Sequence, residues 1–167
     1  IPALVGHRLH RIYYYDAAPS SMTVDAVLGG EPLKLGETEA YARNTALQTK
    51  LARTDFYAVR LGELAVRGWL PKKNLQGVKG TSHELTASNI KPNVQQKGVD
   101  MRIGLDIAAL TLKKIAHVVV LVAADADFIP AMKFARREGS QVILVTLGNA
   151  MNQQMADHAD IVYTDVI

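Results

Sequence analysis

Two short, almost entirely apolar runs in the second half of the chain constrain its fold more than any other feature. HVVVLVA covers residues 117–123 and QVILVT covers residues 141–146. Continuous runs of Val, Ile and Leu at this length are typical of strands buried on both faces of a parallel sheet. Parallel neighbours need a crossover connection, so the residues between the runs are expected to form a helix.

Helical segments alternate with these strands. In residues 99–114, apolar side chains recur at helical spacing and form one stripe, made of Val99, Ile103, Ile107 and Leu110. Residues 128–139 are predicted to form a second helix. Pro130 is tolerated in its first turn, and Gly139 can adopt the left-handed conformation that ends a helix. Residues 150–159 are expected to form another helix and residues 161–166 a last strand. The alternation predicts an α/β fold with mainly parallel strands, right-handed crossovers and helices on both faces.

The first half of the chain gives a weaker pattern. Residues 11–17 and 55–64 are predicted strands, residues 65–70 are expected to pair back on the second of them, and residues 37–54 are a predicted helix. Residues 71–98 contain five Lys, two Pro and three Gly and few large apolar side chains. We expect a long, basic, polar loop there, and such loops in compact domains are usually functional or mobile.

Length and composition place the chain among ordinary globular domains. Its 167 residues, 49% hydrophobic and 21% charged, predict a single domain spanning residues 1–167. The absence of Cys excludes disulfides and thiolate metal ligands, and it fits a reducing compartment. The longest apolar stretch, residues 115–124, is about half the ~20 residues that a membrane-spanning helix needs. No signal peptide is evident, so a cytoplasmic location without a membrane partner is predicted.

Three carboxylates are predicted to meet at one edge of the parallel sheet. Asp125 and Asp127 follow the apolar run directly, and Asp100 lies at the amino end of the predicted helix 99–114. Ligands of open parallel sheets bind at the carboxyl ends of the strands. Clustered carboxylates need a cation to offset their charge, and oxygen ligands favour a hard ion such as Mg²⁺ or Mn²⁺. Such an ion activates water and neutralises a phosphoryl group.

Each of these acids also has a purely structural interpretation. Asp127 could cap the helix that follows it, Asp125 could stabilise a turn, and Asp100 could interact favourably with its helix dipole. Asp106 flanks the apolar stripe on the side opposite Asp100 and lies about 9 Å further along the helix axis. Asp106 therefore lies too far along the helix to join Asp100 on one ion easily. It is either an outer-shell acid of the predicted metal site or a buried group hydrogen-bonded to a neighbouring strand, and we favour a supporting role.

Positive charge gathers in the first part of the chain. Residues 1–99 hold 13 Lys and Arg against 8 Asp and Glu, whereas residues 100–167 hold 6 against 8. A basic part beside an acidic part could hold a polyanion over a cation-dependent site, although a solvated surface gives the same pattern. The candidate phosphate contacts are Lys72, Lys73, Lys79, Lys91, Lys97, Arg60 and Arg67. Trp69 could stack a base. A core or interface position is the more usual role of a lone Trp near a strand end.

Three segments together resemble the NYN domain of the LabA-like, PIN-like nuclease superfamily. They are QKGVDMRIGLD at residues 96–106, VVVLVAADADFIPAMKFARREGSQVILV at residues 118–145 and MADHADIVYTD at residues 155–165. The family's S-G-D-S-D-F motif reads A-A-D-A-D-F here, with both acids and Phe128 kept. The segment RIYYYDA also resembles the family's second strand, while residues 64–95 are mostly unmatched.

The resemblance implies a three-layer α/β/α, PIN-like fold and Mg²⁺- or Mn²⁺-dependent cleavage of RNA, expected to be single-stranded. It matches Asp100, Asp125 and Asp127 to the family's acidic positions and Asp106 to a second acid in the helix. The family's first strand carries an IDGxN-like motif whose Asp is a central metal ligand. This chain has no such motif, and we expect that its amino-terminal segment is missing from the chain as given.

Several functions stay open at this point. The first is a metal-dependent ribonuclease, and the second is an RNA-binding or assembly module with a degenerate nuclease site. A haloacid dehalogenase-like phosphohydrolase also places D-x-D after a strand, but its nucleophile would lie early in the chain and its phosphate-binding Lys later. The sequence leaves a homo-oligomer open as well.

Overall fold

The computed structural model describes residues 4–73 and 84–165 of the chain. The chain divides into two compact units. One consists of residues 13–99 and is called the antiparallel unit, after its longest strand pair. The other consists of residues 1–12 and 100–167 and is called the parallel unit. Each unit is described by itself.

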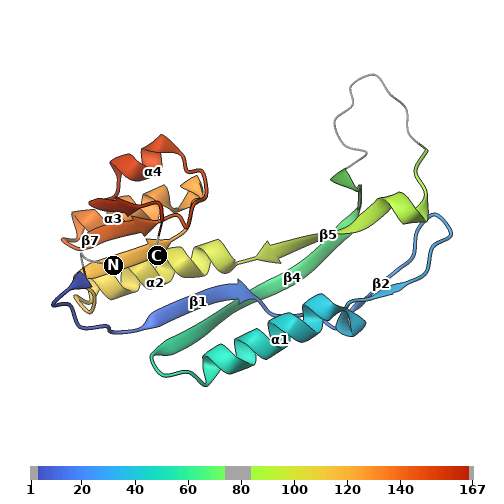
Figure 1. Ribbon diagram of the computed structural model, residues 1–167, viewed down its shortest axis with the longest axis horizontal. Coiled ribbons are helices and arrows are strands. Elements are labelled where there is room, and N and C mark those ends of the chain that lie inside the picture. Colours follow the sequence, from blue (N-terminus) through green and yellow to red (C-terminus); the bar gives the residue numbers. More distant parts are fainter. Residues whose placement is uncertain (1–3, 74–83, 166–167) are drawn as a thin grey trace. The chain divides into compact units, whose positions relative to one another are not determined.

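The antiparallel unit is built around two long strands and one helix. Its elements are β1 (Ile12–Ala17, whose first residue belongs to the other unit), β2 (Thr23–Val24), β3 (Leu33–Lys34), the 3₁₀ turn η2 (Leu35–Glu37), α1 (Glu39–Ala52), β4 (Tyr57–Pro71), η4 (Ala87–Asn89) and β5 (Ile90–Lys97). The main sheet has the order β1-β4-β5, and β2 pairs with β3 alone. Figure 1 shows β4 and β5 running side by side along much of their length.

Pairing between β4 and β5 overturns two expectations from the sequence. The ladder runs from Glu63 opposite Lys97 to Pro71 opposite Ile90, with an irregularity between Val66 and Trp69. Residues 65–70 therefore continue β4 and do not fold back on it. Residues 90–97, expected within a polar loop over 71–98, form a strand because β4 supplies their backbone partners. Residues 74–83 of that predicted loop lie outside the described part of the chain.

The carboxylate of Asp16, near the end of β1, is the centre of a hydrogen-bond network in this unit. Its Oδ1 accepts from the backbone N–H of Ala17 at 2.8 Å and from Nε2 of Gln96 at 2.9 Å. Its Oδ2 accepts from Nε2 of Gln48 at 3.0 Å and from the hydroxyl of Tyr14 at 3.3 Å. Gln48 is buried and also donates to the carbonyl of Ala17 at 3.0 Å. The network ties together β1, α1 and β5.

Tyr14 gives this network a dependence on alkaline pH. Burial of the hydroxyl, and then the negative charge and hydrogen bond of Asp16, raise the pKa of Tyr14 above its usual value of 10.0. A group whose pKa is higher in the folded state than in the unfolded state contributes its full stabilisation below the unfolded pKa. That contribution is lost as pH rises through the folded pKa. We expect the free energy of unfolding, measured in urea, to fall more steeply above pH 10 in wild type than in Tyr14→Phe. Parallel curves for the two proteins would contradict this.

The parallel unit contains the alternating elements that the sequence predicts. They are α2 (Val99–Leu112, whose first residue belongs to the other unit), β6 (Val118–Val122), η5 (Ala126–Phe128), α3 (Ile129–Arg137), β7 (Gln141–Val145), α4 (Gln153–Asp157) and β8 (Ile161–Tyr163). The sheet has the order β6-β7-β8, and both strand pairs are parallel. Pro130 lies in the first turn of α3, and Gly139 after its end has φ +89°. The mixed α/β class and the parallel strands are thus confirmed.

The core of the parallel unit lies around β7. Residues 142–145 are all buried, and Leu144 is fully inaccessible to solvent. One cluster joins side chains from α2, β6, η5, α3, β7 and α4, and its members are Ile107, Leu121, Phe128, Met132, Ala135, Val142, Leu144 and Met155. Strand β6 departs from the expected burial on both faces. Only Leu121 is buried there, because β6 is an edge strand of the described sheet, and Val122 is 57% exposed.

Membrane insertion of a helix finds no support in the described segments. Over residues 4–73 and 84–165, none of the helices has both the length and the apolar character needed to span a bilayer.

Candidate functional site

The carboxyl edge of the parallel sheet gathers the polar residues that follow its three strands. Asp125 and Asp127 come after β6, Thr146 comes directly after β7, and Asp165 comes two residues after β8. Because β6, β7 and β8 are parallel, their carboxyl ends lie on one edge. Such an edge is the usual ligand-binding position of an open α/β sheet.

The turn after β6 is fixed by Asp125. This residue is the N-cap of η5, and its Oδ1 accepts a hydrogen bond from the backbone N–H of Asp127 at 3.0 Å. Its carbonyl accepts from the N–H of Phe128 at 3.3 Å, and the Phe128 side chain anchors the turn in the core. Asp125 thus stabilises the turn, as its structural interpretation proposed. Helix α3 follows η5 directly, and its N-cap residue is Phe128, which makes no side-chain cap hydrogen bond. The structural interpretation of Asp127 as the cap of the following helix is therefore wrong.

Both carboxylates of this turn are exposed to solvent. Asp127 lies in the first turn of η5, where the partial positive charge of the helix start favours an anion. Oδ1 of Asp125 holds the backbone, but a carboxylate has about four acceptor positions on its two oxygens. Capping and cation binding by Asp125 are therefore compatible.

Asp100 enters the same edge from α2. It lies in the first turn of that helix and is exposed. Residues 113–117 connect α2 to the start of β6, and the Ile103 and Ile107 side chains pack in the same core as Leu121 of β6. Helix α2 is about 20 Å long and strand β6 about 17 Å long. Because α2 connects to the start of β6 and packs along it, the first turn of α2 is expected near the carboxyl end of β6.

The acids on this edge do not form a closed coordination group. Among the side chains that the structure describes, no three His, Asp or Glu residues are grouped so that they could hold a metal ion. Asp106 is half-buried further along α2 and has an interaction partner of its own. The donor set nevertheless fits a hard cation in kind, because exposed carboxylate oxygens are the ligands that Mg²⁺ and Mn²⁺ prefer.

The predicted phosphate contacts that the structure describes lie in the antiparallel unit. Lys73, Lys91, Lys97 and Arg67 are exposed, and Nζ of Lys72 donates to the carbonyl of Ser88 at 2.7 Å. The guanidinium of Arg60 stands 5.7 Å from the centre of the Tyr13 ring. Lys79 lies outside the described residues. Trp69 is half-buried in β4 and lies opposite Pro92 of β5.

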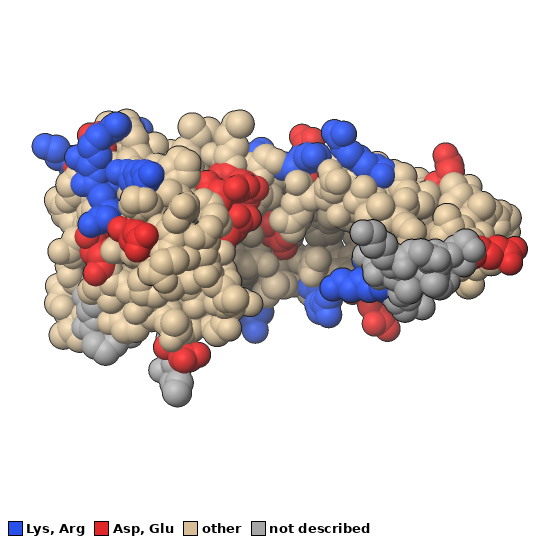
Figure 2. Space-filling view, turned by 90° about the horizontal axis from the view of Figure 1, so that it is seen from above, with Lys and Arg blue, Asp and Glu red and all other residues tan. Residues whose placement is uncertain are grey.

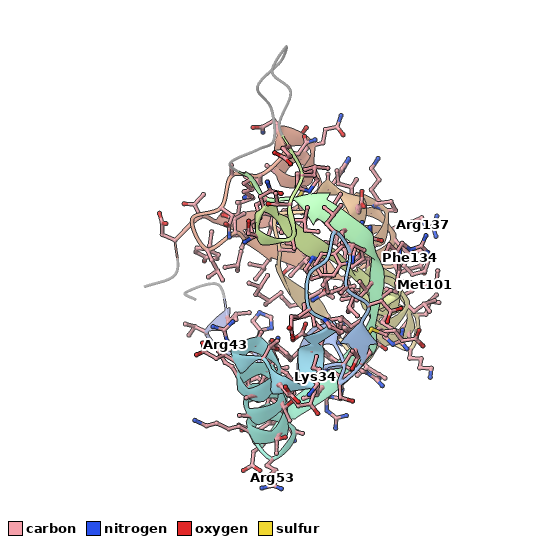
Figure 3. All side chains as sticks on the ribbon, turned by 90° about the vertical axis from the view of Figure 1, so that its right-hand side faces the viewer. Lys34, Arg43, Arg53, Met101, Phe134 and Arg137 are labelled. Atoms are coloured by element: carbon pink, nitrogen blue, oxygen red, sulfur yellow. The ribbon has the colours of Figure 1, made fainter. Side chains whose placement is uncertain are left out.

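Two basic side chains of α3, Arg136 and Arg137, contact neighbouring residues of the protein. Arg136 forms an ion pair with Asp160 at 3.1 Å, and Asp160 also accepts from the N–H of Val142 at 2.7 Å. The guanidinium of Arg137 lies 5.0 Å from the centre of the Phe134 ring, and Figure 3 labels both side chains. In the face drawn in Figure 2, Lys and Arg form several separate groups with Asp and Glu beside them.

Sequence reasoning missed two acids that the structure makes relevant. Asp165 follows β8 and shares the carboxyl edge with Asp125 and Asp127. Its place at the end of the last predicted strand was the available signal. Asp16 is the centre of the network described above, and its signal was a carboxylate inside the otherwise apolar and aromatic run IYYYDA.

Comparison with known proteins identifies the chain's relatives at the level of a family. The family model described as NYN domain matches residues 9–166. Neither the curated proteins nor the solved structures include a significant match. The family match covers both compact units and includes every acid discussed above.

Proposed function

Because the chain belongs to the NYN domain family, a nuclease-like family, we propose that it is a Mg²⁺- or Mn²⁺-dependent ribonuclease that hydrolyses phosphodiester bonds of single-stranded RNA. The single observation that carries this proposal is the family match over residues 9–166, which includes Asp100, Asp125 and Asp127. Support comes from Asp125 and Asp127, which follow the parallel strand β6 at the kind of sheet edge where α/β proteins bind their ligands.

The acids have the chemistry that phosphodiester hydrolysis requires. Asp100, Asp125 and Asp127 would hold the cation, with Asp106 as an outer acid. A bound Mg²⁺ or Mn²⁺ would supply an activated water and would neutralise charge on the phosphoryl oxygens. Asp125 would keep its own carboxylate oriented through the 3.0 Å hydrogen bond from the N–H of Asp127.

Basic residues of the antiparallel unit support RNA as the substrate. The exposed Lys73, Lys91, Lys97 and Arg67 would contact phosphates, and Lys72 and Arg60 would add to them. Contacts of this kind are independent of sequence and weaken as salt is added. They would raise the affinity of the chain for RNA of any sequence.

We expect purified protein to cleave a fluorescently labelled single-stranded RNA when Mn²⁺ or Mg²⁺ is added, and to stop when excess EDTA is added. Product length on denaturing gels over time measures the reaction. A control incubation with Ca²⁺ separates catalysis from charge screening, because Ca²⁺ binds oxygen ligands in a looser geometry. Cleavage that persists in EDTA would contradict the metal-dependent mechanism.

The second candidate is an RNA-binding module whose nuclease site is degenerate. The basic residues of the antiparallel unit favour it, because they could bind RNA without any contribution from the acids. This function predicts salt-sensitive retention of the labelled RNA, measured by fluorescence anisotropy, with no shortening of the RNA at any Mn²⁺ concentration. Salt-sensitive binding together with Mn²⁺-dependent cleavage would exclude it.

A further inference from the structure

Two tyrosines of β1 lie next to each other on one face of the main sheet. The ring centres of Tyr13 and Tyr15 are 6.3 Å apart, and their planes differ by 21°. Side chains of a strand alternate between its two faces, so Tyr14 and Asp16 lie on the opposite face. Helix α1 contacts that opposite face, because Nε2 of its Gln48 donates to Asp16. The Tyr13–Tyr15 pair therefore belongs to the face of β1 that points away from α1.

Arg60 of β4 adds a positive charge to this pair. The central carbon of its guanidinium lies 5.7 Å from the centre of the Tyr13 ring, within the range of a cation–π contact. Arg60 is exposed, and Tyr13 and Tyr15 are half-buried. Three planar side chains therefore lie together at the surface of the antiparallel unit, and we call Tyr13, Tyr15 and Arg60 the aromatic cluster.

The strands around the aromatic cluster carry more positive than negative charge. Strands β1, β4 and β5 together contain four Lys or Arg side chains and two acids. One of the two acids, Asp16, accepts four hydrogen bonds from its neighbours in the unit. A net positive charge favours an anionic ligand. Aromatic planes beside a cation favour a ligand that also carries flat aromatic groups.

We propose that the aromatic cluster stacks the bases of single-stranded RNA. Unpaired bases stack on Tyr rings and on Arg guanidinium planes, and sheets that present such side chains are a common way of binding single strands. Bases of a duplex are paired and stacked on one another, so their planes are not available to the cluster. The proposal rests on the proposed function for its ligand, and it adds that base planes are contacted as well as phosphates. Only residues of the antiparallel unit take part, and no metal ion is needed.

Binding of a fluorescently labelled oligouridylate, measured by anisotropy in EDTA, tests the proposal without metal and without cleavage. Tyr13→Leu and Tyr15→Leu each remove a ring and leave an apolar side chain, whereas Tyr13→Phe combined with Tyr15→Phe keeps both rings. Tyr41→Leu is the matched control, because Tyr41 is a half-buried residue of α1 in the same unit. The second ligand is an abasic strand with the same number of phosphates and the same label. Urea unfolding of every variant is measured in parallel.

We expect Tyr13→Leu and Tyr15→Leu each to raise the Kd for oligouridylate at least about fivefold, the lower end of what stacking of one base contributes. The double Phe variant and Tyr41→Leu should stay within about twofold of wild type, because both keep the two rings. The Kd for the abasic strand should be the same for all variants. The salt dependence of the Kd should not change either, because no phosphate contact is removed.

An unchanged Kd in the Leu variants, or an equal loss of affinity for the abasic strand, would overturn the proposal, while Mn²⁺-dependent cleavage would still decide the proposed function separately. If neither Leu variant folds, wild type decides. Equal affinity of wild type for oligouridylate and the abasic strand would rule out stacking, and a preference for oligouridylate would support it. Ring-dependent binding by a protein that does not cleave RNA with Mn²⁺ would support the proposal and overturn the proposed function in favour of the second candidate.

Discussion

Replacing Asp125 and Asp127 together by Asn is expected to reduce kcat/KM for RNA cleavage at least about 100-fold, since even outer-shell partners of a metal site contribute about 10–100-fold. Both substitutions keep the size of the side chain and remove its negative charge. The loss should appear at every Mn²⁺ concentration, because a neutral amide is a poor substitute for a carboxylate ligand of a hard cation. Initial rates on labelled single-stranded RNA measure the effect.

Asn is the informative substitution because Asp125 also caps η5. Asn is about as good an N-cap as Asp, and its side-chain oxygen can accept the same hydrogen bond from the N–H of Asp127. The fold is therefore expected to survive while the charge is lost. Ala at position 125 would remove the cap as well, at a cost of about 0.5–2 kcal/mol, and would confuse the two roles.

The matched control is Asp25→Asn combined with Asp55→Asn. Both residues are exposed and belong to the antiparallel unit, and the double change adds the same positive charge as the test variant. This control matters because added positive charge strengthens RNA binding without any specific contact. Equal cleavage rates for the test variant and wild type would show that the acids after β6 do not carry the chemistry.

The parallel unit could be predicted from sequence because its pattern is local. The runs at residues 118–122 and 141–145 are apolar and β-branched, and α2 carries its buried Ile107 on the predicted stripe. Each of these signals is given by the spacing of apolar residues within one segment. It can be recognised without knowing which other segment packs against it. The same sequence reading placed Asp125 and Asp127 after a parallel strand, which the structure confirms.

The antiparallel unit was harder to predict because its strands depend on each other. Strand β5 contains Pro92 and several polar residues, and its sequence IKPNVQQK has no apolar alternation. It becomes a strand because β4 pairs with it, and Pro92 is tolerated next to the irregularity after Val66. Strand propensity is strongly dependent on such tertiary partners. No local pattern could have shown that Gln96 contacts Asp16, 80 residues earlier.

The sequence predicted which residues belong to the candidate site, but not the distances between them. The exposed acids of the site are held by turns and helix starts, so the separation between them depends on backbone positions that no sequence pattern specifies. The confusion between Asp127 and Asp125 as the cap has the same origin. A 3₁₀ turn capped by Asp125 precedes α3, whose own N-cap is Phe128, and the exact ends of helices are the least predictable part of an element.

Leu144→Ala is expected to lower the free energy of unfolding of the parallel unit by about 2–5 kcal/mol, the usual cost of removing a buried Leu side chain. Leu144 is 0% exposed and lies in the central strand β7, opposite Leu121 of β6 and Val162 of β8. Strands on both sides hold the backbone, so the surroundings cannot collapse easily into the space left by the removed atoms. Urea unfolding followed by far-ultraviolet circular dichroism at 222 nm measures the change.

The choice of probe and control makes this result specific to the β7 core. Trp69, the one Trp of the chain, lies in β4 of the antiparallel unit, so its fluorescence does not report directly on β7. Leu105→Ala removes the same atoms from the parallel unit at a position that is 63% exposed, and it should change stability by less than about 0.5 kcal/mol. Similar losses for the two variants would mean that Leu144 does not lie in a close-packed core, and the arrangement of β6, β7 and β8 around it would then be wrong.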